Sequence, residues 1–410
     1  MSKLQELINK LCPNGVEFKK LKELAEIGTG SSDKKDANTN GKYPFFVRSK
    51  NIEKHNAFEF DEEAIIIPGE GGIGDIFHYI KGKYALHQRV YRIHFTCDSI
   101  NVKFAYYYLF AHFKSFIMKK AVSATVTSIR KPMIEDFFLP IPPIEVQEEI
   151  VRILDSFSDY AAELQAELQA RKQQYEYYRN LLLTFNPSAY GCGTDDEQKD
   201  GVTTWGGHNY KIEWKKMGEI GTFIRGKRFV RTDIMDRGVP CIHYGDMYTY
   251  YGLYTDNTPT FLKEEKAQKM RFAQKNDIVI VAAGENKDDL GNAVAWLGEK
   301  PAAVHDACFI FRSNLYPNYI SHICRSHNYH KQIKMFANEA KICSVSGQDL
   351  QKVLIPVPEY ELQIKIASIL DRFETLVNDL TNGLPAEIAA VKDQYEYYRN
   401  KLLTFKKLTA

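Results

Sequence analysis

The chain has 410 residues, of which 44% are hydrophobic and 26% charged, and this composition indicates a globular protein of two or more domains. Its formal net charge of +2 excludes a protein that is basic over its whole surface, so any affinity for DNA must come from local patches or from a partner. No apolar run approaches the roughly 18 residues that span a membrane, and no two of the seven cysteines form a C-x-x-C pair. With its short, charged start, the chain is therefore expected to be cytoplasmic, without a secretory signal, a disulfide framework or a metal site.

Residues 1–143 predict a mixed α+β domain in which strands dominate. Short runs of β-branched and aromatic residues alternate with Gly, Asn and Asp, and Ala64–Ile67 is typical of a buried strand that ends at a glycine turn. Short helical stretches such as Phe104–Phe110 interrupt the strands. The pattern does not determine the order of the strands.

Three features resemble catalytic or cofactor motifs, and each has a plainer interpretation. Gly69–Gly74 fits G-x-G-x-x-G, but the following residues alternate like a strand where a dinucleotide fold needs a helix, so a glycine turn that could approach DNA is favoured. His87 and the matching His305 lack a second ligand or nucleophile nearby, which favours a structural hydrogen bond over catalysis. Asn186–Tyr190 lacks the second proline of the N-P-P-Y motif of amino-methyltransferases and is rejected.

A long helix is expected over residues 144–186, after the prolines at 142 and 143. Apolar residues recur there at alternating spacings of three and four, as in a coiled coil. They are Val146, Ile150, Ile153, Phe157, Tyr160, Leu164, Leu168, Tyr175, Tyr178, Leu182 and Phe185. Residues 187–210 are rich in glycine and contain an acidic run, and they predict a mobile connector.

The second half of the chain repeats the first. The sequence Q-Y-E-Y-Y-R-N at 174–180 recurs at 394–400, and the Pro-x-Pro and glutamine of 140–147 recur at 356–363. Residues 211–358 therefore predict a second β-rich domain, and residues 359–406 predict a second long helix. The matches lie mostly in the helices, whereas the globular parts differ strongly.

The two helices are expected to pair as an antiparallel coiled coil, because a lone helix would leave its apolar stripe exposed. The predicted fold class is thus α+β, with two mixed, β-rich domains separated by two long helices and an internal pseudo-two-fold repeat. Residues expected to serve helix pairing or partner docking are Ile153, Leu164, Tyr175, Tyr178, Ile369, Leu376, Tyr395 and Tyr398. The alternative, in which each helix packs on its own domain, stays open.

These repeated motifs resemble those of the DNA-specificity subunits of type I restriction–modification systems, over nearly the whole chain. The resemblance implies two target-recognition domains that read a bipartite site in double-stranded DNA, and two helices that set the spacing and dock two methyltransferase subunits. Restriction subunits could join that complex. The resemblance also implies a non-catalytic chain with no cofactor of its own, since S-adenosylmethionine, ATP and Mg would be used by the partner subunits. Because the globular parts differ, the two half-sites should differ.

Candidate DNA contacts are basic and hydroxyl-bearing residues in polar loops. The strongest is the basic loop of residues 225–231, whose arginines suit phosphate contacts or bidentate contacts to guanine. The candidates are Arg225, Lys227, Arg228, Arg231, Lys34, Lys35, Arg48, Lys50, Thr125, Thr127, Arg130, Ser344 and Ser346. Each could instead be an ordinary solvated residue.

Two other functions stay open, namely a specificity subunit of a restriction–methylation enzyme outside type I and a coiled-coil scaffold that does not bind DNA. The second helix also carries four extra residues between its motifs, and Gly383 and Pro385 predict a kink or break there. If the helices act as a ruler, deleting residues 381–384 should change the tolerated spacer between the half-sites without changing the half-sites.

Overall fold

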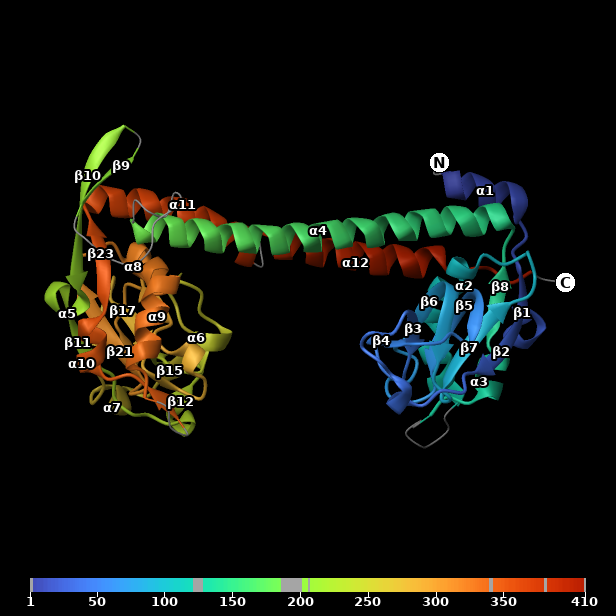
Figure 1. Cartoon of the computed structure of the whole chain (residues 1–410), viewed down its shortest axis with the longest axis horizontal. Coiled ribbons are helices and arrows are strands. Elements are labelled where there is room, and N and C mark those ends of the chain that lie inside the picture. Colours follow the sequence, from blue (N-terminus) through green and yellow to red (C-terminus); the bar gives the residue numbers. More distant parts are fainter. Residues whose placement is uncertain are drawn as a thin grey trace. The chain divides into compact units, whose positions relative to one another are not determined.

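The computed structural model describes residues 3–120, 128–185, 201–205, 207–338, 342–379 and 382–408. The chain divides into two compact units. The first unit comprises residues 1–165 and 387–410, and the second comprises residues 166–386. Each unit therefore contains one globular domain, part of the first long helix and part of the second helical segment (Figure 1).

The first domain is built on a six-stranded sheet in the order β2-β7-β5-β6-β3-β4, in which only β3 and β6 pair in parallel. The predicted strand Ala64–Ile67 is the fully buried centre of β5, and α2 packs against the core beside it. The elements are α1 (Lys3–Leu11), β1 (Glu17–Lys20), β2 (Ala25–Thr29), β3 (Tyr43–Phe46), β4 (Ile52–His55), β5 (Phe60–Pro68), β6 (His78–Leu86), β7 (Val90–Phe95), α2 (Val102–Lys120), α3 (Lys131–Glu135) and β8 (Phe138–Ile141).

The second domain contains two five-stranded sheets, in the orders β11-β21-β17-β19-β14 and β12-β15-β13-β20-β16. Its buried centre is β17, an apolar strand in which all four residues are buried. The strands are β9 (Gly201–Trp205), β10 (His208–Lys216), β11 (Gly221–Arg225), β12 (Ile234–Met235), β13 (Val239–Ile242), β14 (Tyr254–Thr255), β15 (Thr260–Leu262), β16 (Phe272–Ala273), β17 (Ile278–Val281), β18 (Ala283–Gly284), β19 (Ala293–Trp296), β20 (Ala302–Val304), β21 (Cys308–Ser313), β22 (Cys343–Ser344) and β23 (Leu354–Pro358). The helices are α5 (Met217–Ile220), α6 (Asp246–Thr249), α7 (Glu264–Ala267), α8 (Pro317–Ile323), α9 (His327–Phe336) and α10 (Gly347–Lys352).

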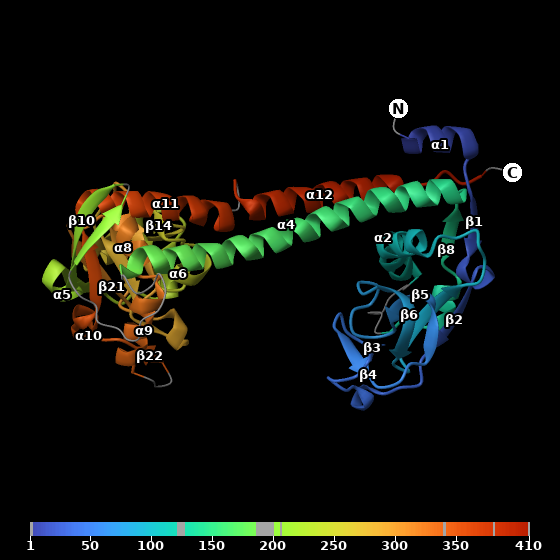
Figure 2. The ribbon, with the colours of Figure 1, turned by 45° about the horizontal axis from the view of Figure 1, so that its top comes forward.

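The first long helix, α4, runs unbroken from Ile144 to Thr184. In the first unit its early turns pack on α2 of their own domain, and Phe157 stacks on Tyr398 of α12 at 5.5 Å between ring centroids. In the second unit its last turns lie beside α11, where Tyr178 stacks on Phe373 at 5.6 Å (Figures 1 and 2). The predicted pairing of the helices is confirmed, and the packing of each helix start on its own domain occurs as well.

The second helical segment is two helices, α11 (Tyr360–Asn378) and α12 (Leu384–Leu402), so the single helix expected over 359–406 was wrong while the predicted break is confirmed. A Cβ on Gly383 would lie 2.5 Å from the carbonyl oxygen of Thr375, so glycine lets the chain pass close to the last turn of α11. Pro385 lies in the first turn of α12, where its missing N–H costs no intrahelical hydrogen bond.

Part of the expected connector is also strand. Residues 186–200 lie outside the described residues, but β9 and β10 pair antiparallel as a hairpin, with Gly207 at a φ of 81° in its turn. The run Val202–Trp205 consists of β-branched and aromatic residues, which favour a strand. The expectation of a mobile connector is therefore wrong for residues 201–205 and 207–210, where Gly207 forms a turn.

A buried glutamine in the first turn of α4 and of α11 connects each helix to its domain. Gln147 accepts the backbone N–H of Asn101 at 2.8 Å and donates to the carbonyl oxygens of Ser99 and Pro142 at 2.8 and 2.7 Å. Gln363 repeats two of these bonds in the second unit, since it accepts the N–H of Tyr316 at 2.9 Å and donates to the carbonyl of Pro358 at 2.8 Å. The repeated motif therefore fixes the direction in which each helix leaves its domain. No helix within the described part of the chain is long and apolar enough to cross a membrane.

Candidate nucleic-acid interface

A close turn recurs beside the sheet of each domain. A Cβ on Gly30 would lie 1.8 Å from the carbonyl oxygen of Leu86, and one on Gly226 would lie 2.1 Å from that of His305. Neither position tolerates a side chain unless the backbone moves. The loops after β2 and β11 are thus held against the loops that carry the matching histidines.

The two histidines have the structural role that the sequence predicted. The Nδ1 atom of His87 accepts the backbone N–H of Arg89 at 3.0 Å, and that of His305 accepts the N–H of Ala307 at 3.1 Å. Burial lowers the pKa of both imidazoles below the usual value, which favours the neutral form needed for this hydrogen bond. The glycine loop at 69–74 is followed by the strand β6 and not by a helix, so it lacks the helix N-terminus that a dinucleotide site requires.

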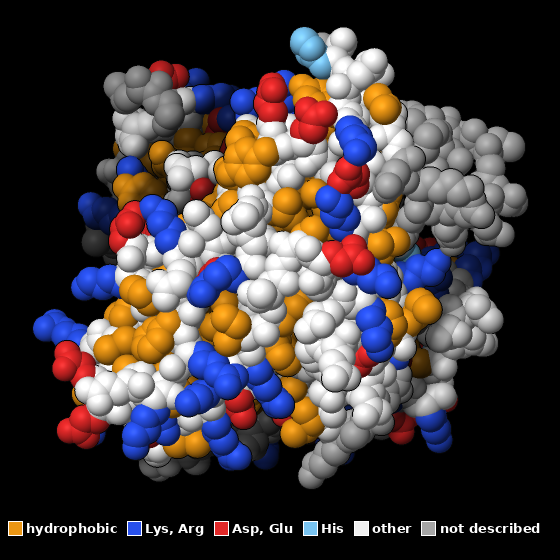
Figure 3. All heavy atoms as spheres, turned by 90° about the vertical axis from the view of Figure 1, so that its left-hand side faces the viewer, with side chains coloured by type: hydrophobic (Ala, Val, Ile, Leu, Met, Phe, Trp, Pro, Cys, Tyr) orange, Lys and Arg blue, Asp and Glu red, His pale blue; other side chains and the backbone are white. Residues whose placement is uncertain are grey.

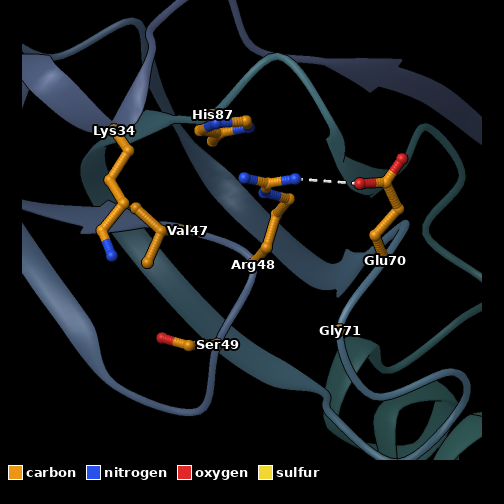
Figure 4. Close-up of a pocket in the computed structure, with 7 residues that line it drawn as sticks. All are labelled: Lys34, Val47, Arg48, Ser49, Glu70, Gly71 and His87. Atoms are coloured by element: carbon orange, nitrogen blue, oxygen red, sulfur yellow. Dashed lines mark hydrogen bonds and ion pairs between the residues drawn. The ribbon is translucent and has the colours of Figure 1, made fainter.

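A pocket of about 330 Å³ opens beside this turn in the first domain. It brings together Lys34 and Arg48, two predicted DNA contacts from separate loops. Figure 4 shows the Arg48 guanidinium between the His87 ring and the Glu70 carboxylate. The lining residues are Lys34, Val47, Arg48, Ser49, Glu70, Gly71 and His87.

Glu70 holds two arginines at this pocket. Its carboxylate accepts Nη1–H groups of Arg48 at 2.9 Å and of Arg89 at 2.9 and 3.1 Å. These hydrogen bonds, that of Arg48 first, hold the pKa of Glu70 below its ordinary value. Two guanidinium groups face the Glu70 carboxylate, and Lys34 lines the same pocket, while the Asp33 carboxylate lies 3.7 Å from His87. Three cations against two carboxylates leave the pocket rim with an excess of positive charge and of hydrogen-bond donors. Such a surface suits phosphate oxygens and the acceptor edges of bases.

The other candidates of the first domain lie in neighbouring loops. Lys35 and Lys50 are exposed, Lys35 within the short 3-10 helix that also holds Lys34. Arg130 is exposed at the start of α3, and the preceding N–H of Ile129 donates to the carbonyl of Gly69 at 2.7 Å, which ties this loop to that of Glu70. Thr125 and Thr127 lie outside the described residues.

The second domain places different side chains at the equivalent positions. The parallel strand pairs β3–β6 and β13–β20 have the same register, which aligns the loop after β3 with the loop after β13. Matching backbone hydrogen bonds after β5 and β17 align the remaining loops of the two domains. The aligned pairs are Arg48 with Tyr244, Glu70 with Ala283, and Arg89 with Ala307. The charged group of the first domain therefore has no equivalent in the second.

In the second domain an aromatic cluster occupies this place. The rings of His243 and Tyr244 lie 4.6 Å apart, and that of His305 lies 5.1 and 5.2 Å from them. Sequence reasoning missed this cluster, as it missed Glu70 and Arg89. The match between His87 and His305 was the signal that could have led to these loops.

In the basic loop of the second domain, some side chains are bonded to or buried in the domain and others are exposed to solvent. The Nε–H of Arg225 donates to the carbonyl of Asp306 at 3.0 Å, and Phe229 is buried in the core. Lys227, Arg228 and Arg231 are exposed, and within the described chain Arg228 and Arg231 form no ion pair. On the face of the second unit in Figure 3, Lys and Arg side chains gather toward the lower edge, at the height of β12 and α7 in Figure 1.

The two candidate serines are positioned differently. Ser344 lies in β22, which pairs with β18 at Ala283, so it reaches the loop that is equivalent to that of Glu70. Ser346 caps α10, because its hydroxyl accepts the N–H of Asp349 at 3.1 Å and donates to the carboxylate at 2.6 Å. Its hydroxyl is thus already engaged in the fold.

The residues predicted for helix pairing or docking divide into buried and exposed groups. Leu164 and Tyr175 are buried, and Tyr175 packs on His322 of α8 in the second unit. Ile153, Ile369 and Tyr395 are half-buried along the helices. Leu376 is exposed, whereas Tyr178 and Tyr398 are partly exposed but stack on Phe373 and Phe157 across the paired helices.

Each Q-Y-E-Y-Y-R-N motif contacts the domain of the other repeat. The motif in α4 reaches the second domain, where Asn180 accepts the N–H of His327 at 2.9 Å. The motif in α12 reaches the first domain, where Arg399 lies over the ring of Phe110 at 5.5 Å. In both copies the second tyrosine is exposed, with Tyr177 at 62% and Tyr397 at 61%. No cluster of metal ligands is present among the residues that the structure describes.

Comparison with known proteins gives consistent matches. A model of the type I restriction–modification DNA specificity domain matches residues 13–171 and 210–390. The chain is 32% identical over 275 residues to the type I restriction enzyme EcoR124I/EcoR124II specificity subunit of Escherichia coli, covering 65% of this chain and 61% of that subunit. It is 29% identical over 411 residues to a putative type I restriction enzyme specificity subunit of Haemophilus influenzae, covering 95% and 96% of the two chains. The type I restriction–modification S subunit of M. genitalium has a similar fold, with a TM-score of 0.55 at 17% identity and full coverage of both chains.

Proposed function

The chain belongs to the family of type I restriction–modification DNA-specificity subunits, and on this premise we propose that its two domains read the two halves of a bipartite site in double-stranded DNA. The observation that carries this proposal is the pair of equivalent loop surfaces with unlike side chains. One surface presents Arg48 and Arg89, and the other presents Tyr244 beside an exposed basic loop. Equivalent surfaces with different chemistry are what two different half-sites would require.

The partners in this proposal are two methyltransferase subunits, to which restriction subunits are added in the complete system. The repetition of the helix ends supports a partner present in two copies. Tyr177 and Tyr397 are exposed to 62% and 61%, so the chain presents the same aromatic side chain twice in the same local setting. Exposed tyrosine is enriched at the centres of protein interfaces.

The chain itself supplies binding and no catalytic group. Its exposed Lys and Arg side chains neutralise phosphates, and side chains at the pocket rim contact base edges. Methyl transfer from S-adenosylmethionine and the steps that use ATP and Mg are assigned to the partner subunits. The strand that follows the Gly69–Gly74 loop and the structural hydrogen bonds of both matched histidines support this division.

The decisive experiment maps methylated adenines in the host genome with and without the gene. The expected result is the loss of one bipartite methylation motif with two unlike halves. The purified chain alone should transfer no methyl group, and the chain together with its methyltransferase should restore the motif. A methylome that does not depend on this gene would contradict the proposal, and a complex without DNA affinity would favour a scaffold.

A further inference from the structure

Arg48, Glu70 and Arg89 come from three separate loops of the first domain, which follow β3, β5 and β6. The Glu70 carboxylate binds one Nη atom of each arginine. A guanidinium has five N–H donors in a fixed fork, so each arginine keeps most of its donors for a ligand. Both remain accessible, with side chains 43% and 58% exposed.

A guanidinium offers only hydrogen-bond donors, so among the bases it pairs best with guanine. Guanine presents two acceptors, N7 and O6, to the major groove, whereas adenine presents one acceptor and one donor. The carboxylate limits the rotation of both side chains, and this reduces the entropy lost on binding. Lys34, at the same pocket, is a flexible point charge and suits a phosphate contact instead.

We propose that the Arg48–Glu70–Arg89 group reads guanine in the half-site bound by the first domain. The proposal rests on the function proposed above and deepens it, because it names the base and the residues. The second domain has Tyr244, Ala283 and Ala307 at the equivalent positions. The guanine read by this group therefore belongs to one half-site only. Arg48 and Arg89 are the specificity-determining residues, and Glu70 is a positioning residue.

The test is to replace each arginine by lysine, which keeps the charge but removes the fork. Arg48→Lys and Arg89→Lys are made singly and together in the full chain, assembled with its methyltransferase. The complex then methylates a library in which both half-sites are randomised. The expected result is that discrimination at one or two guanine positions of a single half-site falls about 5- to 150-fold, while the other half-site is unchanged.

The matched control is Arg92→Lys in the same domain. Arg92 also bonds a carboxylate, that of Glu62 at 3.1 Å, but it is buried within the sheet. This variant should lower the melting temperature and leave the base preference intact. The lysine variants at 48 and 89 should instead change the base preference with little change in melting temperature, which separates base reading from a purely structural clamp.

The outcomes distinguish the two proposals. Suppose that the wild-type complex modifies a bipartite site and that the two single lysine variants and the double variant all keep every base preference. The guanine assignment is then wrong, and the proposed function stands. The assignment also fails if the relaxed position is not guanine. If the wild-type complex modifies no site that depends on this chain, the proposed function itself fails.

Discussion

The junctions between domain and helix are alike in the two halves of this molecule, whereas the recognition loops are not. Gln147 and Gln363 are both buried and share two hydrogen bonds, one accepted from a backbone N–H of the domain and one donated to a proline carbonyl. Asp155 and Asp371 both accept side-chain donors from the adjoining domain helix. The loops that carry Glu70 in one domain carry an alanine in the other. Residues that hold the framework match, and residues of the loops proposed to contact DNA differ.

The difference shows which parts of the repeat have the same task in both copies. Both helices must leave their domains in a defined direction, so the same amide recurs at the same place. The loop surfaces need only present a ligand-specific set of donors and acceptors, and the scaffold beneath them, with its close glycine turn and histidine, is retained.

The largest effect is expected at the junctions. Gln147→Ala removes the partners of three backbone groups and should lower the free energy of unfolding by about 3 kcal/mol, and Gln363→Ala should lower it by about 2 kcal/mol. Denaturant unfolding of the purified chain measures both. Gln169→Ala, on an exposed face of α4, is the control and should change stability by less than about 0.5 kcal/mol. If one junction variant is as stable as this control, the two glutamines do not have the same role in the two halves of the chain.

Acid should weaken the second unit through His330. Burial, together with the charges of Arg325 and Lys334, lowers the pKa of His330 to about 4. Below the unfolded pKa of about 6.5 the unfolded chain binds a proton that the folded chain excludes, so stability falls from there until the folded pKa is reached. The expected loss from this group is about 2 kcal/mol between pH 7 and pH 5. Unfolding of wild type and His330→Gln at both pH values measures it, and an equal loss in the two proteins would contradict it.

A smaller effect is expected in the basic loop of the second domain. Arg228→Ala should weaken DNA binding by the assembled complex by about 1 kcal/mol and reduce the slope of affinity against salt by about one, as for a lost phosphate contact. Arg225→Ala should act mainly on the loop, because Arg225 is bonded to the carbonyl of Asp306. If a variant with both Arg225→Ala and Arg228→Ala binds DNA with unchanged affinity and an unchanged salt slope, the basic loop is not part of the DNA interface.

The smallest effect on stability is expected at the exposed tyrosines. Tyr177→Ala and Tyr397→Ala should each change stability by less than about 0.5 kcal/mol, because both side chains are largely in water. If they receive a partner present in two copies, each should weaken methyltransferase docking to a similar degree, which a titration of the two purified proteins measures. Loss of docking in one variant alone would mean that the two helix ends serve different partners.

The duplication, the α+β class, the long helices, the break near Gly383 and the buried strand at the centre of the first domain could all be predicted from the amino-acid sequence. These features rest on local periodicity and on residues whose backbone preferences act within a few positions. The sequence also indicated Lys34, Arg48 and the loop of residues 225–231 as surface cations, since charge and turn residues are visible along the chain. It did not indicate which of them share a site.

Which of these cations share a site follows from the folded structure alone. The sheet order β2-β7-β5-β6-β3-β4 brings the loops of Arg48, Glu70 and Arg89 together, and strand order depends on contacts between residues distant in sequence, which a local pattern does not encode. The same holds for the helix ends. Their apolar stripe predicted a partner, but the packing within each unit decided that each Q-Y-E-Y-Y-R-N motif contacts the domain of the other repeat. Burial of an apolar stripe is favourable against any complementary surface, and only the folded chain selects one.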